Sequence, residues 1–214
     1  MRRQIETIIW DWNGTMLDDL ELCIATINHL LRERNIPELD PVRYRREFGF
    51  PVKDYYERIG FDFKKEPFDI PARQFIDLYE KGMYDCRLFS DVKPILTRLK
   101  SIGYSQLVLS AMEKSKLIAT LRHNKILGYF DHISGLEDHY AHSKLENGKR
   151  LLVELNLNPA ATCLIGDTLH DLEVAEAMGI QAFLVAYGHQ DEDRLRKSGA
   201  NVVRDLQEFV AFLS

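Results

Sequence analysis

One stretch near the start of the chain decides its fold: Ile8-Ile9-Trp10-Asp11-Trp12-Asn13-Gly14-Thr15. An apolar run that ends in a carboxylate is typical of a buried strand whose carboxyl end faces a ligand site. We therefore expect a first strand over residues 5–11. Gly14 permits a tight turn and a close approach of the backbone to an anion directly after that strand.

The chain after Asp91 supplies partners for this strand. Short apolar runs alternate there with amphipathic helical stretches, several of which end at glycine. This alternation predicts an α/β fold, a three-layer α/β/α, Rossmann-like parallel sheet with helices on both faces. Further strands are expected at residues 106–110, 132–134, 162–166, 181–186 and 201–203, and the helices between them at 92–101, 115–127, 142–155, 171–178 and 191–197.

A helical segment interrupts this pattern directly after the first strand. Between residues 18 and 85 the apolar side chains recur with helical spacing. We predict a core domain of residues 1–17 and 86–214 and an α-helical cap domain of residues 18–85 inserted after the first strand. A length of 214 residues suits one such core with a modest insertion.

Composition and charge exclude several classes of function. Lys and Arg number 28 against 33 Asp and Glu, a net charge of −5, so no global basic field would attract nucleic acid or an anionic membrane. Cys23, Cys86 and Cys163 lie far apart among apolar neighbours, which indicates buried reduced thiols and no zinc site. The N-terminal apolar run is too short for a signal sequence or a membrane span. We expect a cytoplasmic protein, either a monomer or a homodimer.

Polar groups lie at the carboxyl ends of three of the expected strands. Asp11 ends the first, Ser110 ends the second, and Asp167 follows the strand at 162–166. Because the carboxyl ends of parallel strands meet at one edge of a sheet, these groups should converge. Together with Asp171 the two other carboxylates would form the oxygen-rich cluster that Mg²⁺ prefers. Each residue alone is also consistent with a plain strand end or helix cap.

A lysine and the order of the motifs extend this pattern. Lys144 lies near the start of a helix, where the helix dipole does not favour a cation, so a functional role is favoured over surface decoration. The chain resembles the haloacid dehalogenase-like superfamily of phosphohydrolases, and within it the phosphoglycolate phosphatase-like members with a small helical cap. The residues that carry the resemblance are, in order, Asp11-x-Asn13-Gly14-Thr15, Ser110, Lys144, Gly166-Asp167-Thr168-x-x-Asp171 and Ala175-x-x-Met178-Gly179.

That resemblance implies a role for each motif residue. It makes Asp11 the nucleophile that forms an aspartyl-phosphate, and it gives Asn13 and Lys144 catalytic positions in a Mg²⁺-dependent phosphatase of small phosphorylated metabolites. The implied metal ligands are Asp11, the backbone carbonyl of Asn13, Asp167 and, in support, Asp171, and the implied phosphoryl-binding residues are Gly14, Ser110, Ala111 and Lys144.

Asn13 departs from the pattern of the resembling family. Most of its phosphatases carry a second Asp two residues after the nucleophile, which protonates the leaving group and later activates water. An Asn side chain cannot exchange a proton at neutral pH, so a contribution of ~10²–10⁴ to the rate is missing. We expect a phosphatase that favours leaving groups needing no proton, such as those of acyl phosphates or phosphoanhydrides.

Other interpretations stay open on the sequence alone. The chain could be a catalytically impaired phosphate-binding regulatory protein, although Asp11, Lys144 and Asp167 are intact. Two other activities of the resembling superfamily are disfavoured. Dehalogenase chemistry uses no metal, whereas Asp167 and Asp171 argue for one. Phosphomutase action depends on proton transfer by the missing Asp. Another group could supply the proton, for which the candidates are His139, His142, His170 and His189.

The cap contains candidate substrate contacts. The stretch 44–53 combines basic residues, aromatic residues and a Gly-x-Pro turn. We predict that Arg45, Arg46 or Lys53 reaches the non-phosphate end of an anionic substrate, the plain alternative being a solvated charge run. A phosphonoacetaldehyde-type hydrolase would need a cap lysine that forms a Schiff base, for which the candidates are Lys53, Lys64 and Lys65.

Overall fold

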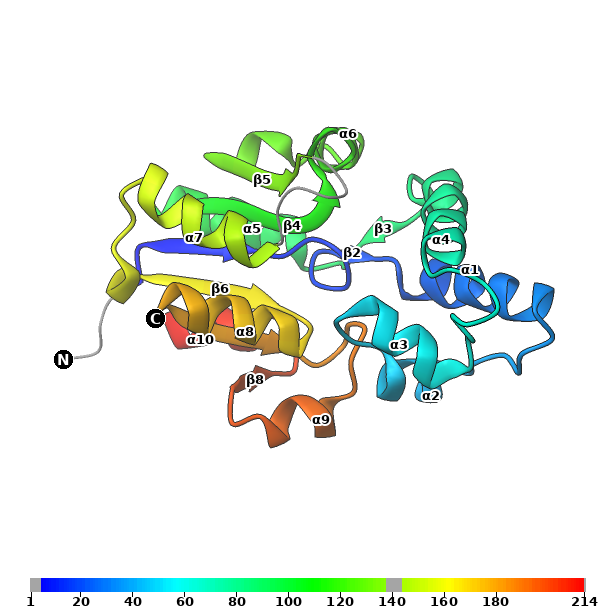
Figure 1. Cartoon of the computed structure of the whole chain (residues 1–214). Coiled ribbons are helices and arrows are strands. Elements are labelled where there is room, and N and C mark those ends of the chain that lie inside the picture. Colours follow the sequence, from blue (N-terminus) through cyan, green and yellow to red (C-terminus); the bar gives the residue numbers. More distant parts are fainter. Residues whose placement is uncertain (1–4, 138–143, 214) are drawn as a thin grey trace.

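The computed structural model, which describes residues 5–137 and 144–213, is built on a six-stranded parallel sheet. Its strands are β1 (Thr7–Trp10), β4 (Ser105–Glu113), β5 (His132–Leu136), β6 (Thr162–Gly166), β7 (Gln181–Val185) and β8 (Asn201–Val203). They lie in the order β5-β4-β1-β6-β7-β8, so β1 is central and pairs with both β4 and β6 (Figure 1). The predicted α/β fold is confirmed.

Helices cover both faces of the sheet. They are α5 (Val92–Ser101), α6 (Lys114–His123), α7 (Lys144–Glu154), α8 (Leu169–Met178), α9 (Glu192–Lys197) and α10 (Leu206–Leu213). The side chains of β1 alternate between two apolar clusters. Ile8 and Trp10 pack in the cluster that contains α5, α6 and α10, and Ile9 packs in the one that contains α7 and α8. A central strand buried on both faces is what a three-layer arrangement requires.

Most element boundaries lie close to the expected ones. The strands at 162–166 and 201–203 are confirmed at both ends. The helix expected at 115–127 ends earlier, at His123, because Lys125 adopts a left-handed conformation with φ of 58° that a helix cannot continue through. β1 is shorter than expected, and residues 142 and 143 of another expected helix lie outside the described residues.

Ser110 corrects one expected boundary. β4 runs past it to Glu113, so Ser110 lies within the strand and not at its end. The regular pairing with β1 stops at Val108, and the pairing with β5 shifts register between Leu109 and Glu113. This irregular stretch has the character of a β-bulge, a feature that re-aims side chains beside functional sites.

A two-stranded antiparallel ladder joins the core to the inserted helices. It pairs β2 (Leu17–Asp18) with β3 (Arg87–Leu88), so the chain leaves and re-enters the core at neighbouring points. The helices between them are α1 (Leu20–Glu33), α2 (Pro41–Glu47), α3 (Val52–Ile59) and α4 (Asp69–Gly82). They form an apolar cluster of their own and lie beyond the carboxyl ends of the strands (Figure 1). The domain boundaries at 17/18 and 85/86 stay a prediction, and the ladder lies beside both.

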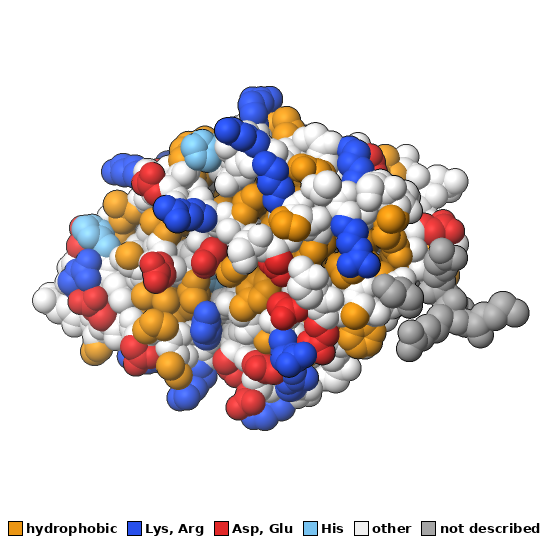
Figure 2. Space-filling view, turned by 180° about the vertical axis from the view of Figure 1, so that it is seen from behind, with side chains coloured by type: hydrophobic (Ala, Val, Ile, Leu, Met, Phe, Trp, Pro, Cys, Tyr) orange, Lys and Arg blue, Asp and Glu red, His pale blue; other side chains and the backbone are white. Residues whose placement is uncertain are grey.

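The surface carries both signs of charge. Figure 2 shows acidic and basic side chains interspersed over one face, with apolar side chains between them. This agrees with the near balance of 28 basic and 33 acidic residues in the sequence. Within residues 5–137 and 144–213, no helix has the length and apolar content needed to span a membrane.

Phe209 of α10 should contribute strongly to the packing of the core. It is fully buried, and its ring centroid lies 5.8 Å from that of Trp10 and 5.0 Å from that of Phe183. We expect Phe209→Ala to lower the free energy of unfolding by ~3–5 kcal/mol, because the truncation leaves a cavity. Phe212 of the same helix is half exposed, and Phe212→Ala should cost less than about 2 kcal/mol in urea unfolding. Equal losses in the two variants would contradict this assignment.

Candidate active site

Three carboxylates meet where β1 and β6 end. Asp11, Asp167 and Asp171 are buried, and one oxygen from each lies within 4.8 Å of the others. The amide of Asp11 donates to the carbonyl of Ile165 at 2.9 Å, which fixes the end of β1 against β6. The Thr15 hydroxyl lies 3.1 Å from Asp11 Oδ2 and 3.3 Å from Asp167 Oδ1, so it bridges two of the carboxylates. The predicted convergence is therefore present.

Lys144 lies between two members of this cluster. It is the first residue of α7, it is buried, and its ammonium group donates to Asp11 Oδ1 and, at 2.5 Å, to Asp171 Oδ1. The other oxygen of Asp171 accepts from the Thr168 hydroxyl at 2.7 Å and from the Thr168 amide at 3.0 Å. Asp171 thus has both oxygens bonded within the protein, which suits it to holding Lys144 and the start of α8 in place.

The charges in this cluster do not balance. Burial raises the pKa of Asp11 to about 6, against the opposing effect of Lys144, and burial raises the pKa of Asp167 to about 7. Burial acts on Asp171 in the same sense, but Lys144 and Thr168 hold its pKa below the ordinary value. Three carboxylates facing one ammonium group leave an excess of negative charge among hard oxygen donors. These residues therefore fit a divalent cation.

Glycine is required where the backbone passes the carboxylates. Gly14 has φ of 70°, and a Cβ at this position would lie 2.3 Å from Asp167 Oδ2. A Cβ at Gly188 would lie 2.2 Å from the same oxygen. Both positions thus exclude any side chain, which leaves the backbone free to approach the floor of the site closely.

A cavity of about 720 Å³ opens above the carboxylates, between the core and the inserted helices. Ser110, Ala111 and Lys144 line it together with Asp11 and Asp167, so the predicted phosphoryl-binding side chains face the same space as the carboxylates. The Ser110 hydroxyl accepts from the Met112 amide at 3.1 Å, which fixes its orientation in the irregular part of β4.

Asn13 is turned toward the cap. Its side-chain amide donates to Asp19 Oδ2 at 2.7 Å and to the Tyr79 hydroxyl at 2.6 Å. Tyr79 in turn donates to Asp19 Oδ2 at 2.8 Å, and the Gly14 amide donates to Asp19 Oδ1 at 3.0 Å. A carboxylate is therefore present beside position 13, but it belongs to Asp19, at the start of α1.

His189 connects this group to the core. Its Nε2 lies 3.0 Å from Asp19 Oδ1, its Nδ1 lies 3.1 Å from the Tyr44 hydroxyl, and its amide donates to Asp167 Oδ2 at 2.6 Å. Burial lowers the pKa of His189, but Asp19 and the neighbouring carboxylates outweigh it and raise that pKa to about 9. His189 is thus protonated at neutral pH and forms a buried ion pair that joins the core to α1 and α2.

The other predicted proton donors are placed differently. His170 lines the cavity, where its ring stacks on Phe50 with centroids 4.5 Å apart, and it bonds Glu173 at 3.0 Å. His139 and His142 lie outside the described residues. His189 reaches the carboxylate cluster through its backbone amide, which donates to Asp167, while its ring contacts Asp19 and Tyr44.

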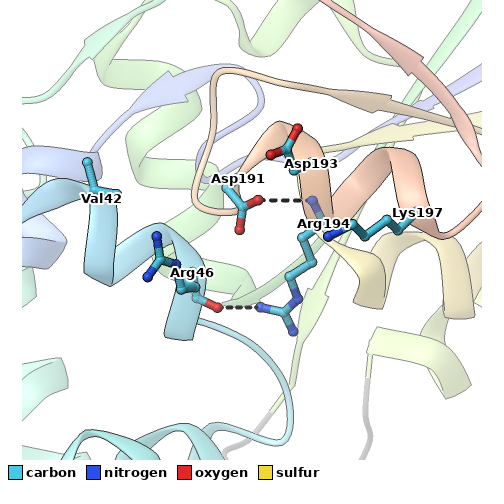
Figure 3. A pocket seen from close by; sticks show the side chains of 6 residues that line it. All are labelled: Val42, Arg46, Asp191, Asp193, Arg194 and Lys197. Atoms are coloured by element: carbon cyan, nitrogen blue, oxygen red, sulfur yellow. Dashed lines mark hydrogen bonds between the residues drawn. The ribbon is translucent and has the colours of Figure 1, made fainter.

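The structure does not bring the predicted cap cations to the cavity. Arg45 donates to the carbonyls of Gly188 and Tyr187, at 3.0 and 3.1 Å, and so ties α2 to the core. Arg46 lines a separate surface pocket between α2 and α9, where its carbonyl accepts from Arg194 (Figure 3). Lys53 is exposed, and its ammonium group lies 5.9 Å from the centroid of the Phe63 ring.

Sequence reasoning does not identify Asp19, Tyr44 or Tyr79 as site residues. Asp19 directly precedes α1 and so has the position of an ordinary helix N-cap, yet its side chain makes no cap hydrogen bond. Tyr79 lies 60 positions further along the chain, and no local pattern connects the two residues. The only signal in the sequence is that Asp19 lies six residues after Asn13, which stands where the resembling phosphatases carry an Asp.

Comparison with known proteins assigns the family. The profile of haloacid dehalogenase-like hydrolases matches residues 8–185. The chain belongs to this family. It is 26% identical to the probable phosphatase IndB of Dickeya dadantii, over 92% of this chain and 88% of that protein. It is also 26% identical to the phosphoglycolate phosphatase of Nitrosospira multiformis, over 87% of this chain and 86% of that enzyme.

The fold agrees with that of solved family members. A haloacid dehalogenase-like hydrolase from Streptococcus pneumoniae superimposes with a TM-score of 0.85 at 22% identity, with 100% of both chains covered. Membership of the family and the similarity to phosphatases support the predicted class of enzyme, a phosphoric monoester hydrolase.

The ion pair of His189 should make stability depend on pH. The pKa of His189 is about 9 in the folded chain against an ordinary 6.5, so the pair stabilises fully below pH 6.5 and its contribution is lost as the pH rises through 9. Without divalent cations, we expect the free energy of unfolding to fall by on the order of 3 kcal/mol over this range. His189→Gln should flatten the fall, while exposed His123→Gln should keep it. If the free energy of unfolding of His189→Gln fell with pH as steeply as that of the wild type, the ion pair would not be the cause of the fall.

Proposed function

We propose that this chain is a Mg²⁺-dependent phosphatase that transfers the phosphoryl group of its substrate to Asp11. The observation that carries the proposal is the floor of the cavity, where Asp11 is buried, paired with Lys144 and within reach of Asp167. Mg²⁺, held by Asp11, Asp167 and the backbone carbonyl of Asn13, would supply positive charge beside the phosphoryl oxygens. The phosphoglycolate phosphatase among the relatives agrees with a small phosphorylated metabolite as substrate.

The reaction would proceed in two displacements. A carboxylate oxygen of Asp11 attacks phosphorus, and the bond from phosphorus to the leaving oxygen breaks with its electron pair on that oxygen. Lys144, Ser110 and the Ala111 amide stabilise the equatorial oxygens in this step. Water then attacks phosphorus, the bond to Asp11 breaks, and inorganic phosphate leaves the regenerated carboxylate.

Asn13 decides which leaving groups are suitable. Its side-chain amide donates one hydrogen bond to Asp19 and one to the Tyr79 hydroxyl. That amide has no proton that it could give up at neutral pH. Burial alone would raise the pKa of Asp19, but His189 and the hydrogen bonds from Asn13 and Tyr79 hold that pKa below the ordinary value, which keeps Asp19 ionised. The site thus favours a leaving group that departs as a stable anion.

The alternative of phosphonate hydrolysis is disfavoured by the position of the cap lysines. That chemistry needs a buried lysine with a lowered pKa facing the substrate. Lys53, Lys64 and Lys65 are all exposed, and none of them is among the described residues that line the cavity. Lys116 does line it, but it forms an ion pair with Glu80.

Asp11→Asn should remove the nucleophile. We expect Mg²⁺-dependent phosphate release to fall by at least ~10³-fold, because no other group forms the covalent bond. Asp193→Asn, on the exposed first turn of α9, is the matched control and should keep wild-type activity. Acid quenching during turnover, followed by peptide mass spectrometry, should find one phosphoryl group on the peptide that contains Asp11. Phosphate release at the wild-type rate from Asp11→Asn would disprove the mechanism.

Asn13→Asp should restore general acid catalysis. The new carboxyl would lie against Asp19, whose charge raises its pKa and keeps it protonated at neutral pH. We expect turnover of alkyl phosphates to rise by ~10²-fold or more, with little change for acetyl phosphate. The double variant Asn13→Asp with Asp19→Asn keeps one carboxyl and one amide at this contact and separates acid catalysis from charge repulsion. An unchanged ratio of alkyl to acetyl phosphate turnover in both variants would show that Asn13 does not limit the reaction.

A further inference from the structure

The wall of the cavity that the inserted helices form is aromatic. Phe75 and Tyr79 lie one turn apart on α4 and stack with centroids 6.2 Å apart and planes 13° apart, and both line the cavity. The Tyr79 hydroxyl contacts Asn13, so the aromatic wall begins directly above the floor. Phe48 and Phe68, which cap α2 and α4, continue this wall.

The core side of the cavity is apolar as well. Met112 lies two residues beyond Ser110 on β4, lines the same space, and packs against the buried clusters of both the core and the inserted helices. A thioether beside aromatic rings makes an adaptable apolar contact. When the phosphoryl group of a substrate is bound at Ser110, the group attached to it would therefore extend between Met112 and the aromatic wall.

The outer cavity has no surplus of positive charge. Beyond the catalytic floor, the acidic residues among its described lining outnumber the basic ones, Arg73 and Lys116. Lys116 is paired with Glu80, and Arg73 is exposed. A carboxylate or a second phosphate on the leaving group would meet aromatic rings and carboxylates there, which disfavours anionic leaving portions. The volume of about 720 Å³ also lies in the range of pockets that enclose ring-sized ligands.

We propose that the leaving group is an uncharged aromatic ring, so that the substrate is an aryl phosphate. The inference rests on the proposed function and names its substrate class. A phenolic oxygen has a pKa of about 10, so it leaves as an anion without a proton from position 13, whereas an alcohol does not. Asp11 forms the bond to phosphorus, the bond from phosphorus to the phenolic oxygen breaks with its electron pair on that oxygen, and water later supplies the proton.

Three substrates separate the two features of this leaving group. Phenyl phosphate has both the ring and the stable anion, benzyl phosphate has the ring on an alkoxide, and acetyl phosphate has a stable anion without a ring. With the full chain and Mg²⁺, we expect kcat/KM for phenyl phosphate to exceed that for benzyl phosphate by ~10²-fold or more. The KM for phenyl phosphate should lie about tenfold below that for acetyl phosphate, which has the better leaving group but no ring to bind.

Variants of the wall test the position of the ring. Phe75→Ala should lower kcat/KM about tenfold for phenyl phosphate and by a clearly smaller factor for acetyl phosphate, which has no ring to lose contact with. Phe63→Ala is the matched control, because Phe63 is a partly buried cap aromatic outside the cavity lining. Thermal denaturation gives a readout without turnover: phenylphosphonate should raise the Tm of the wild type more than methylphosphonate does, and Phe75→Ala should abolish the difference.

The outcomes distinguish this inference from the proposed function. Benzyl phosphate turned over as well as phenyl phosphate, or a KM for acetyl phosphate no higher than that for phenyl phosphate, with dependence on Asp11, would overturn the aryl assignment and leave the phosphatase standing. An equal effect of Phe63→Ala and Phe75→Ala would likewise overturn it. The absence of Asp11-dependent phosphate release from every substrate would overturn both.

Discussion

The buried contact of Lys144 with Asp11 and Asp171 is the interaction on which the rest of the site depends. Taking three carboxylates out of water is costly unless each finds a partner, and one lysine serves two of them here. Its position requires α7 to begin at the carboxyl edge of the sheet, and that of Asp171 requires the first turn of α8 at the same edge. The remaining excess of negative charge among oxygen donors is what makes these residues fit a divalent cation.

The site has an amide at position 13 and a carboxylate at position 19, and the two are hydrogen-bonded to each other. The carboxylate that family phosphatases carry two residues after the nucleophile is absent, and Asp19 places another within 2.7 Å of the Asn13 amide. The pair with His189 keeps Asp19 ionised, so this carboxylate acts as a hydrogen-bond acceptor and orients its neighbours. Proximity of a carboxylate is thus not sufficient for acid catalysis, because its protonation state is set by its partners.

The sequence predicts the sheet and the meeting of Asp11 with Asp167 well because both depend on local patterns. The alternation of apolar runs and helices determines the layers, and Asp11 and Asp167 each follow a strand, which determines where they meet. The network at Asn13 could not be predicted, because it joins Asp19 to Tyr79 and His189 across 60 and 170 positions. Such contacts depend on how the inserted helices sit on the core, which no local period encodes.

The cap cations fail to reach the cavity for a related reason. Their spacing predicts a basic stretch on the inserted helices, but it leaves open which face of those helices meets the core, and Arg45 meets backbone carbonyls there.

In the proposed reaction, substrate fit and leaving-group selection would depend on the same residues of the inserted helices. Tyr79 belongs both to the wall of the cavity and to the hydrogen-bond group around Asn13, and Tyr44 bonds the histidine that holds Asp19. Contacts between α1, α2, α4 and the core therefore complete the environment of the reacting oxygen when the cap is in place. An enzyme that lacks an acid discriminates against alkoxide leaving groups without contacting them, by ~10²–10⁴-fold. In the proposed reaction, selectivity would arise from the missing proton and from the apolar wall together, and each would exclude substrates that the other admits.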